Sequence, residues 1–574
     1  MYALYGIYQK LAMGQVRSAS TFFNPNFAAS YYLGSIGFVL GSITSSRKSV
    51  GRFCLCIGAL AILIGSLWCT QSRSGLGGLV LVAVVWIWAS TRKARWALVG
   101  AAVLVAALVI FPNPARDRLS KGVSKDPYAF DRIRIWEQTL KIIGDHPVMG
   151  VGIGNFEYST HAYRFPLERE IGRFGRMYRD AHNSYLQVTA ELGLPGAVCL
   201  LAAIVIIFIR IRSLLRFFAD PPQAKQNHHA SLEPLGRPQG SCQQPGIHST
   251  SADAWDGPQR AVARAHVVSA LLALVAVMSQ AFFHEIVDSP PSVFLAVLAA
   301  GIVGYYWRAF ERGAKETQSS NSPSPANPSR PSRGILVLVT LFLVLVFWPH
   351  FSLRVFLADL VFKKAEHALP VLGFEAAEGL LRDAIRLNPA QAYFHKALGD
   401  LLVEEFEKKA KLEYLQEAEE KFETAASLNR MDPHLVFHLG QFYSYVSLRG
   451  IGGKEAEDHS LEAYRKAVQM SPFNVHYLAR LALEEWKRGN ILKALKAAQR
   501  AVELEPNFVA GCYLVSVISG LLGEQGLKEE WKLKLEMASE KHLKHVPLNE
   551  YERLLGLSPT QYFAGEHLPS EFFK

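Results

Sequence analysis

Two arginines and one histidine are of types that could bind an anion and move a proton. Arg17 and Arg73 each lie just before an apolar run, and His182 lies in a long polar stretch that leads into another such run. At the end of a membrane span, a guanidinium group can form forked hydrogen bonds to phosphates at the lipid headgroup level. A histidine can take up a proton near pH 7. These residues could therefore bind an anionic group at a membrane surface and move a proton beside it.

The apolar residues of this 574-residue chain are concentrated in its first part. Half of all residues are hydrophobic and the mean hydropathy is positive, yet roughly the last 220 residues are rich in Glu, Lys and Ala. This distribution indicates a membrane domain followed by a water-soluble domain. The net charge of +11 has a membrane explanation, because Lys and Arg lie mainly at the ends of apolar runs or among Glu on helix faces. No nucleic-acid partner is expected.

Eight apolar runs are long enough, or nearly long enough, to cross about 30 Å of hydrocarbon at about 1.5 Å per residue. They lie at Phe27 to Ile43, Phe53 to Thr70, Leu76 to Ser90, Trp96 to Phe111, Leu192 to Ile209, Ala263 to Phe283, Ser292 to Trp307 and Ile335 to Phe351. Several are short and would need tilt or snorkelling side chains. The sequence therefore predicts a polytopic α-helical membrane protein.

The loops between these runs alternate in charge, which predicts their sides of the membrane. Basic loops occur at Arg47/Lys48/Arg52, Arg92/Lys93/Arg95, Arg210/Arg212/Arg216 and Arg308/Arg312/Lys315. These loops should be cytoplasmic. The segments between them then face outward: Met1 to Asn26, the turn around Arg73, the loop Pro112 to Glu191, the turn His284 to Pro291, and everything after Phe351.

Arg73 and His182 also have simpler interpretations. Arg73 could be an ordinary snorkelling arginine, although a basic residue on an outward turn runs against the positive-inside tendency, which favours a specific use. His182 could be a solvated loop histidine, although its context AHNSYLQ and its outward placement favour a chemical role. Both alternatives stay open at the level of the sequence.

Two stretches dense in Pro, Ser, Gln and Asn, 220–259 and 313–333, are expected to be disordered and cytoplasmic. The paired histidines His228 and His229 lie in the first stretch and are interpreted as solvated. The predicted domain boundaries are a membrane domain 1–310 with outward loop 112–191 and cytoplasmic loop 220–259, a linker 311–334, a final span 335–351, a repeat domain 360–545 and a tail 546–574.

From Phe374 onward the sequence is amphipathic with helical spacing, and similar helix ends recur as AIRLNP, AVQMSP and AVELEP. Pro472 and Pro506 are 34 residues apart, which is the tetratricopeptide period. A looser copy ends at Pro433, and the longer intervals of 44 residues before it and 39 residues after it predict insertions in the connecting turns. Small residues such as Ala467 and Ala501 should let paired helices approach. A solenoid of this kind usually binds a peptide or protein, so a protein partner is expected.

Three outward motifs resemble one known family. They are RSASTFFNPNFAA from Arg17, QSRSGLGGL from Gln71, and AHNSYLQVTAELGLPG from Ala181, with RIRIWEQTLKIIGDHPVMGVGIGNF from Arg132 upstream of the third. Their order and content resemble the O-antigen ligase/polymerase family of membrane glycosyltransferases, including the branch with C-terminal tetratricopeptide repeats. The resemblance covers roughly Arg17 to Pro291.

The resemblance implies a fold, a reaction and a set of residues. It implies an all-α chain, with a polytopic membrane domain of the GT-C type followed by a tetratricopeptide α-solenoid. The membrane domain would lie in a bacterial inner membrane and the solenoid in the periplasm. Family members transfer a glycan from an undecaprenyl-diphosphate carrier to an acceptor hydroxyl, without a metal ion or other cofactor. Arg17 and Arg73 match the arginines that hold the diphosphate, and His182 matches the essential histidine. Possible supporting residues are Asn183, Arg132, His284 and Asp288.

The chemistry of these residues agrees with that assignment. Arginines could neutralise charge that develops on the leaving diphosphate. His182 could remove the proton of the acceptor hydroxyl as it attacks the anomeric carbon, or it could hydrogen-bond the diphosphate or orient a substrate. The reaction is expected to invert the anomeric centre. The acceptor could be lipid A core, a growing polysaccharide, or a protein Ser or Thr.

Two further patterns in the long loop bear on its structure. Phe130 to Ile143 should form an amphipathic helix that packs over the membrane-facing cavity, with Phe130, Ile133, Trp136, Leu140 and Ile143 on one face. The glycine run GVGIG from Gly150 is similar to a dinucleotide-binding loop, but it follows a helix rather than a strand, so we interpret it as a tight turn. The six cysteines have no disulfide or metal-site spacing, and no paired acidic motif stands out, so no metal is predicted.

A function from another class is also consistent with the sequence. The chain could be a non-catalytic membrane anchor or a lipid-glycan transporter whose repeats recruit protein partners. A transporter should carry polar groups along a membrane-crossing path, and the spans here hold few ionisable residues. Family members also have more spans before RSASTFFNPN, whereas this chain begins a few residues earlier at Met1. We therefore expect either an incomplete reading frame or a chain that lacks those helices.

Overall fold

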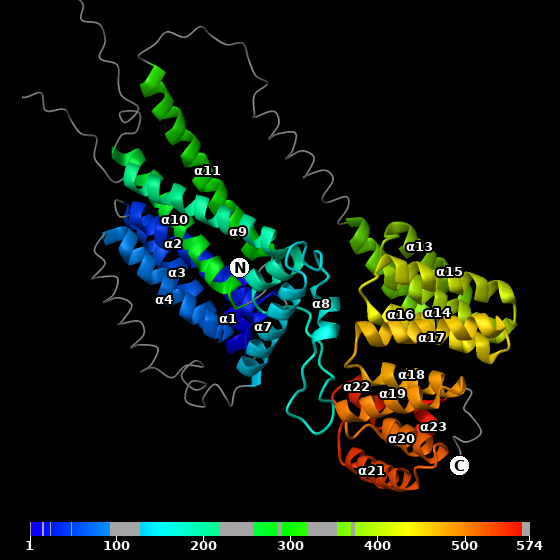
Figure 1. Cartoon of the computed structure of the whole chain (residues 1–574). Coiled ribbons are helices and arrows are strands. Elements are labelled where there is room, and N and C mark those ends of the chain that lie inside the picture. The colour runs from blue at the N-terminus through cyan, green and yellow to red at the C-terminus, as the bar shows by residue number, and fades with distance from the viewer. Residues whose placement is uncertain are drawn as a thin grey trace, which may run out of the picture. The chain divides into compact units, whose positions relative to one another are not determined.

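The computed structural model describes residues 2–13, 17–22, 24–46, 49–91, 127–218, 257–283, 290–319, 353–368 and 373–564. Within these ranges the regular elements are helices, with no strand among them, so the predicted all-α fold class is confirmed. The chain divides into two compact units (Figure 1). The membrane unit comprises residues 1–153 and 180–326, and the repeat unit comprises residues 154–179 and 327–574.

The membrane unit is a helical bundle. Its helices are α1 (Tyr2–Leu11), α2 (Pro25–Ser46), α3 (Val50–Thr70), α4 (Arg73–Thr91), α7 (Pro127–Asp145), α9 (Ser184–Phe217), α10 (Gly257–Ala281) and α11 (Pro290–Ser319). Helices α2 and α10 are central, since each contacts the other and both contact α4 and α11. They approach closely because α2 carries glycine at the contact: a Cβ atom at Gly41 would lie 2.4 Å from Ser269 Cα. Small residues at a helix interface are typical of membrane bundles.

Four described helices are long and apolar enough to cross a membrane, namely α3, α9, α10 and α11. They coincide with four of the eight predicted spans. Helix α4 contributes a shorter apolar stretch, Arg73–Ala89, and the predicted span Phe27 to Ile43 falls on α2, which is not among the four. The predicted spans Trp96 to Phe111 and Ile335 to Phe351 lie outside the described residues.

Two helices extend into segments predicted as linkers. Helix α10 begins at Gly257, inside the predicted loop 220–259, and α11 continues to Ser319, past the predicted linker start at 311. The α11 extension has the sequence GAKETQS, in which Ala, Lys, Glu and Gln are good helix formers. Local propensity therefore prolongs the apolar helix beyond its last large apolar residue. The remainder of both predicted linkers lies outside the described residues.

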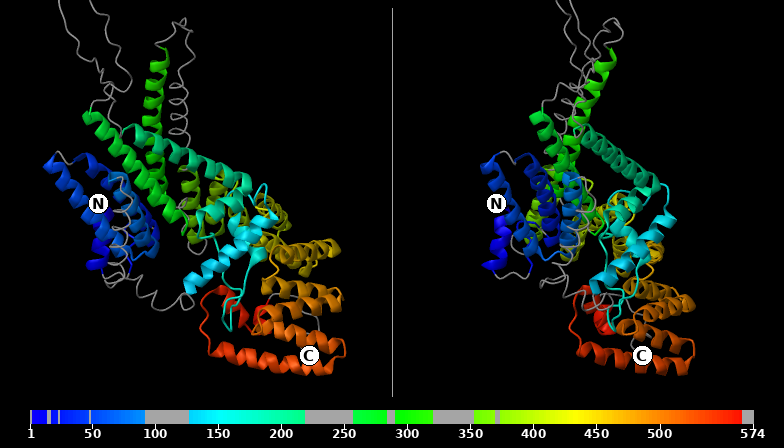
Figure 2. Two further views of the ribbon diagram at one scale, coloured as in Figure 1. Left: turned by 60° about the vertical axis from the view of Figure 1, so that its left-hand side comes forward. Right: turned by 90° about the vertical axis from the view of Figure 1, so that its left-hand side faces the viewer.

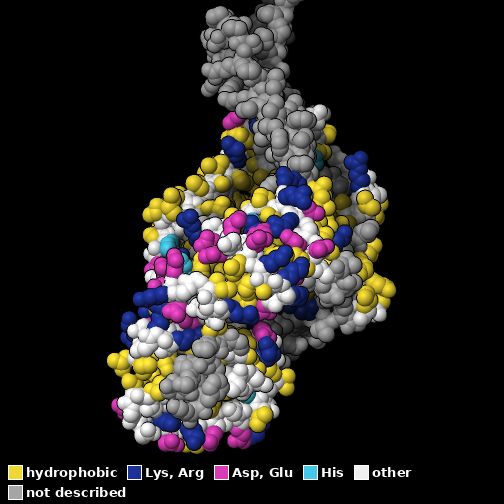
Figure 3. Space-filling view, turned by 90° about the vertical axis from the view of Figure 1, so that its right-hand side faces the viewer, with side chains coloured by type: hydrophobic (Ala, Val, Ile, Leu, Met, Phe, Trp, Pro, Cys, Tyr) yellow, Lys and Arg dark blue, Asp and Glu magenta, His cyan; other side chains and the backbone are white. Residues whose placement is uncertain are grey.

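The repeat unit is a stack of antiparallel helix pairs (Figures 1 and 2). Residues 353–368 are helical. They are followed by α13 (Phe374–Leu387), α14 (Ala392–Lys409), α15 (Leu412–Leu428), α16 (Pro433–Leu448), α17 (Gly453–Met470), α18 (Val475–Lys487), α19 (Ile491–Leu504), α20 (Val509–Leu521), α21 (Gln525–Leu543), α22 (Glu550–Leu555) and α23 (Pro559–Tyr562). Lys and Arg side chains are interspersed with Asp and Glu over the face seen in Figure 3. This mixed surface is typical of a water-soluble domain.

The predicted repeat pattern holds in its small residues. Ala467 and Ala501 are fully buried between paired helices, as expected. Helices α17 and α19 end two residues before Pro472 and Pro506. Pro433 behaves differently, because it is the first residue of α16, preceded by the N-cap Asp432. It therefore begins a helix instead of ending one, in agreement with the preference of proline for the first helical position.

The prediction that insertions lie in the connecting turns is wrong. Helices α14 and α15 have 18 and 17 residues, whereas α18 and α19 have 13 and 14. The longer intervals thus come from longer helices. Longer helices in a pair extend the buried contact, so they disturb the stack less than a long loop would.

Candidate active site

A cavity of about 510 Å³ opens in the membrane unit. Its walls come from α4, α7 and the end of α10, and its lining residues are Arg73, Ser74, Gly77, Gly78, Leu81, Arg132, Ile133, Trp136, Ser279 and Phe283. The structure therefore brings two residues predicted from the sequence, Arg73 and Arg132, to one cavity. The rest of the lining is mostly apolar. Two guanidinium groups in an apolar recess can hold a multiply charged anion that carries a hydrocarbon part.

Arg73 is placed by a two-residue turn between α3 and α4. Gln71 caps α3 in the left-handed conformation, with φ 52°. Ser72 follows, and its hydroxyl accepts a hydrogen bond from the Gly75 N–H at 3.3 Å, which caps the start of α4. Arg73 is the first residue of α4, so its guanidinium lies at the end of the helix where unsatisfied N–H groups create positive potential. Both features favour an anion at this end of the cavity.

Arg132 and Trp136 project from α7. The predicted helix over Phe130 to Ile143 is confirmed by α7, and two residues of its predicted face, Ile133 and Trp136, line the cavity. The buried side chains belong to Asp131, Ile135, Thr139 and Ile142, while Ile133 is 47% exposed and Leu140 is 57% exposed. Thr139 can be buried because its hydroxyl donates to the Ile135 carbonyl at 2.7 Å. The opposite face is thus left to present Ile133 and Trp136 to the cavity.

The segment that carries His182 is tied to the cavity wall through Trp136. The Trp136 indole N–H donates to the Ala181 carbonyl at 3.0 Å, and the Ala181 N–H donates to the Gln187 side chain at 2.8 Å. Asn183 is the N-cap of α9 and accepts from the N–H groups of Tyr185 and Leu186. Asn183, a predicted supporting residue, therefore caps α9 directly after His182.

His182 has an acidic partner that the sequence analysis missed. Its Nδ1 lies 2.5 Å from Asp180 Oδ1, and its backbone N–H donates to the same oxygen at 3.0 Å. The His182 backbone has φ 50°, a conformation that non-glycine residues seldom adopt. Since Asp180 binds both groups, it holds the imidazole in one orientation. The only signal in the sequence is the spacing Asp-x-His. That spacing brings the two side chains together only when the backbone turns at His182.

Arg17 lies at the turn between α3 and α4 and does not line the cavity. Its Nε donates to the Thr70 carbonyl at 3.2 Å, and its Nη2 donates to Asn26 Oδ1 at 3.0 Å. The guanidinium thus contacts the last residue of α3, three positions before Arg73. His284 and Asp288, two further predicted supporting residues, lie outside the described residues.

The glycine run is a turn, as predicted, and it fastens the loop to a break in α9. Gly193 interrupts α9 with φ 69°, and a Cβ atom there would lie 2.2 Å from the Val148 carbonyl oxygen. The break leaves carbonyls of α9 without helical partners, and the N–H groups of Val151 and Gly152 donate to Ala190 and Glu191 at 2.9 and 3.0 Å. The end of α7 and the start of α9 are therefore joined by backbone hydrogen bonds.

Comparison with known proteins gives a family match for part of the chain. Residues 58–201 match the model of the O-antigen ligase family, and this range contains Arg73, Arg132 and His182. No match is found among curated proteins. Part of the chain is similar to solved structures at low identity. MamA from Desulfovibrio magneticus RS-1 has 16% identity over 32% of this chain and 96% of that chain, with a TM-score of 0.27.

Two other similar structures have comparable scores. YrrB, described as a tetratricopeptide protein with an unusual peptide-binding site, has 18% identity, covers 32% of this chain and 87% of that chain, and has a TM-score of 0.25. The Pseudomonas aeruginosa protein PilF has 17% identity, covers 37% of this chain and 86% of that chain, and has a TM-score of 0.26. The family resemblance inferred from the motifs is confirmed for residues 58–201, which match the O-antigen ligase family model.

Proposed function

We propose that this chain transfers a glycan from an undecaprenyl-diphosphate carrier to an acceptor hydroxyl on the periplasmic face of a bacterial inner membrane. The observation that carries the proposal is the cavity lined by Arg73 and Arg132 inside the range that matches the O-antigen ligase family. A role in ligase- or polymerase-type glycan transfer follows from the family. The identity of the donor, the identity of the acceptor and the side of the membrane are proposed in addition.

The cavity suits a diphosphate joined to a hydrocarbon chain. Arg73 and Arg132 supply two guanidinium groups, each able to bind two phosphate oxygens. The N-terminus of α4 adds positive potential at the same place. Leu81, Ile133 and Phe283 provide apolar walls against which an isoprenoid could lie. The volume of about 510 Å³ falls within the usual range for small-ligand sites.

The reaction would be a displacement at the anomeric carbon. The acceptor oxygen forms a bond to that carbon as the bond to the diphosphate oxygen breaks, and the leaving diphosphate gains negative charge. The two arginines would stabilise that charge. His182 would take the acceptor proton. If its Nδ1–H donates to Asp180, Nε2 carries the lone pair that the proton needs.

Arg17 would act through the turn that carries Arg73. Its hydrogen bond to the Thr70 carbonyl fixes the end of α3, and the two-residue turn then fixes where α4 begins. Trp136 would act in a similar way on the other side, because its indole holds the Ala181 carbonyl beside the cavity wall. Both are positioning residues in this scheme.

The periplasmic placement rests on the alternation of basic loops along the sequence. On that pattern the α3–α4 turn and the His182 segment face outward together, and the repeat unit follows on the same side. Cysteine labelling from outside the cell tests this directly. Accessible cysteines at Ser427, which is exposed on the repeat unit, and near His182 are expected, with protected cysteines near Lys93. The reverse pattern would refute the topology.

The decisive experiment is transfer in reconstituted membranes. The full chain is supplied with an undecaprenyl-diphosphate-linked oligosaccharide and with lipid A core, a polysaccharide or a Ser/Thr peptide as acceptor, and release of undecaprenyl diphosphate is followed. Release that depends on an acceptor is expected, and adding a chelator should not abolish it. A folded, inserted chain that binds the donor but never consumes it would favour the alternative, a non-catalytic anchor or transporter.

A further inference from the structure

Residues 154–179, the distal part of the long loop, are docked on the repeat helices. This docked segment contains the short helices α8 (Phe156–Ser159) and η2 (Thr160–Tyr163) and a following irregular stretch. Ile171 and Phe174 are buried in the same hydrophobic cluster as residues of α18 and α20. The Phe174 ring stacks on Phe473 with centroids 5.3 Å apart, and its backbone N–H donates to Glu505 Oε1 at 2.8 Å.

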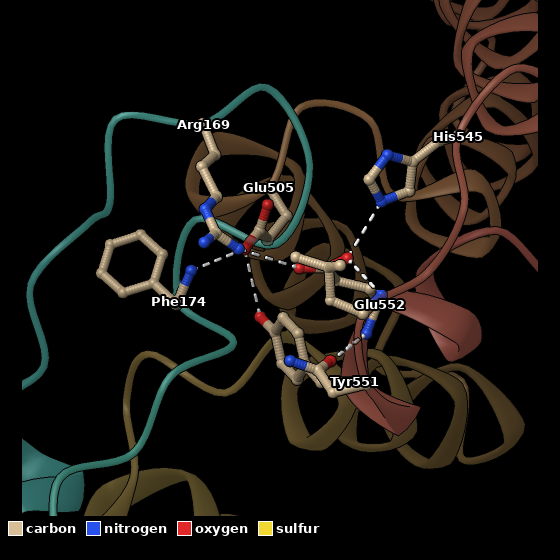
Figure 4. A network of polar contacts seen from close by, with 8 residues as sticks. Arg169, Phe174, Glu505, His545, Tyr551 and Glu552 are labelled. Carbon is tan, nitrogen blue, oxygen red and sulfur yellow. Dashed lines mark hydrogen bonds and ion pairs between the residues drawn. The ribbon is translucent and has the colours of Figure 1, made fainter. Parts of the chain in front are cut away.

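Polar contacts surround this aromatic anchor (Figure 4). Arg173 donates to the Leu504 carbonyl at 3.4 Å, and the Asn507 amide donates to the Glu170 carbonyl at 2.6 Å. Arg169 pairs with Glu552 of α22 at 3.5 Å. Glu552 is almost fully buried and also binds His545. The backbone of the docked segment is therefore recognised as well as its side chains.

A buried arginine organises the docked segment itself. Arg164 donates to the Phe174 carbonyl at 3.1 Å and contacts His161 Nδ1 at 2.9 Å. His161 lies 3.5 Å from the Ser471 hydroxyl and packs its ring on His434. Because Arg164 ties η2 to the Phe174 anchor, the two contact points with the repeats are held at a fixed spacing.

The contacts follow successive turns of the repeat stack. His161 lies at Ser471, where α17 leads into α18, and Phe174 lies at Glu505, where α19 leads into α20. Tyr158 adds an interaction with Asn429, where α15 leads into α16. The docked segment therefore runs along three consecutive inter-repeat turns. Such a row of equivalent positions, each bound by a different side chain, is how a repeat array recognises an extended peptide.

We propose that the ligand of this repeat surface is the chain's own docked segment, and that docking positions His182 for the transfer reaction. Arg179 at the end of the segment pairs with Glu157 near its start at 3.3 Å, which closes the segment into a loop. His182 follows three residues later. The segment's other end joins the turn that is hydrogen-bonded to α9. The first half of this proposal, docking of the segment on the repeats, rests on the contacts alone. The second half, positioning of His182, rests on the proposed function.

The docking half is tested by limited trypsin digestion of the full chain in membranes. Arg164, Arg169 and Arg173 are potential cleavage sites that docking should protect. Phe174→Ala removes the anchor, and cleavage at these arginines should rise about tenfold or more. Lysines of α14 and α15 in the same digest report whether the repeats stay folded. Equal cleavage of the wild type and of Phe174→Ala, with the repeats intact, would overturn docking.

A matched pair of arginine variants separates docking from general surface charge. Arg169→Ala breaks the ion pair with Glu552, whereas Arg553→Ala breaks an exposed pair with Glu550 on the same helix, α22. Only Arg169→Ala should increase cleavage at Arg164 and Arg173. An equal effect of both variants would show that the protection does not come from docking.

The positioning half is tested by transfer kinetics of the same variants. Phe174→Ala should lower kcat several-fold with little change in KM for the lipid-linked donor, and Phe174→Tyr, which keeps the stacked ring, should restore it. If Phe174→Ala exposes the segment to trypsin but leaves kcat unchanged, the positioning of His182 is refuted and docking is not. A wild type that never consumes the donor would refute the proposed function, and the digestion result would still decide docking.

Discussion

Arginines of one long loop have two different uses in this molecule. Arg132 lines a cavity of about 510 Å³ in the membrane unit, whereas Arg164 is buried in the repeat unit between His161 and the Phe174 carbonyl. The cavity has open space beside its guanidinium groups. Around Arg164 that space is filled by protein, and burial lowers the pKa of its guanidinium. The first environment can accept a foreign anion, and the second holds the chain's own backbone.

This difference changes the meaning of the loop's positive charge. Taken as composition, nine arginines between Pro112 and Asp180 suggest attraction to an anionic carrier. The structure divides them, because Arg164, Arg169 and Arg173 contact the docked segment or the repeats. Net charge therefore overstates the cationic surface that a substrate could meet. Variants in the cavity should affect chemistry, and variants in the docked segment should affect order.

The largest effect is expected at His182. If its imidazole takes the acceptor proton, His182→Ala should lower kcat by about 10²- to 10⁴-fold while insertion is kept. Asp180→Asn should cause a smaller loss, because the ring stays in place but its orientation is less fixed. His146→Ala, an exposed histidine of the same loop, is the matched control. Equal rates for His182→Ala and the wild type would remove His182 from the reaction.

A smaller effect is expected at the two cavity arginines. Arg73→Lys and Arg132→Ala should each lower kcat/KM for the donor by about tenfold to a hundredfold, since a charge-assisted hydrogen bond contributes about 1.5 to 3 kcal/mol. Arg134 lies two residues from Arg132 on α7 but pairs with Glu137 at the surface. Arg134→Ala should therefore keep the wild-type rate. If Arg132→Ala and Arg134→Ala behaved alike, the cavity would not be the diphosphate site.

The sequence predicted helices better than it predicted what they bury. Apolar spacing and the recurring AIRLNP-type ends were enough to place the ends of α13, α15, α17 and α19, because each repeat buries a periodic face. The face of α7 that lines the cavity was predicted at Ile133 and Trp136. The buried face with Thr139, whose hydroxyl donates to the Ile135 carbonyl, was not predicted. Which apolar residues a helix exposes depends on the surfaces around it, and the helix sequence does not contain them.

The docked segment and Asp180 could not be predicted for a related reason. Ile171 and Phe174 lie in an irregular stretch without periodicity, and their partners are more than 300 residues away in the sequence. Asp180 acts on His182 only because the backbone at His182 has a positive φ. The arginine and histidine candidates came from family motifs, and the cavity unites Arg73 and Arg132 but places Arg17 at the adjacent turn.

The docked segment should loosen in acid. Burial lowers the pKa of His161 to about 2, with Arg164 and His434 adding to the shift, and burial also lowers the pKa of His434, which faces Asp432 and Tyr477. Below the unfolded-state pKa of about 6.5, the unfolded state takes up protons that these buried histidines do not. The stability of the docked state is therefore complete above that pH and is lost as the pH falls below it. Trypsin cleavage at Arg169 should therefore rise by up to about tenfold for each histidine per pH unit below 6.5.

Glu505 should change the stability of docking with pH in the opposite direction, so it serves as the control for that experiment. Burial raises the pKa of its carboxyl group, with Arg173 and Tyr551 nearby, so its contribution is present at low pH and is lost as the pH rises through the raised pKa. Glu505→Gln keeps an oxygen for the Phe174 N–H and carries no charge. It should tighten docking at neutral pH and leave the acid response intact. Loss of the acid response in Glu505→Gln would show that the histidines do not cause it.

The last comparison concerns the start of the repeat unit. The helix over residues 353–368 buries Ala358 against Ala384 and Phe394, and Ala365 against the next core cluster. A soluble fragment that begins at residue 353 should therefore be more stable than one that begins at Phe374, by about 1 to 3 kcal/mol for the apolar surface that the extra helix covers. Both fragments should be helical without detergent, and thermal unfolding followed by circular dichroism measures the difference. Identical midpoints would mean that this helix belongs to the connection from the membrane unit and does not cap the repeats.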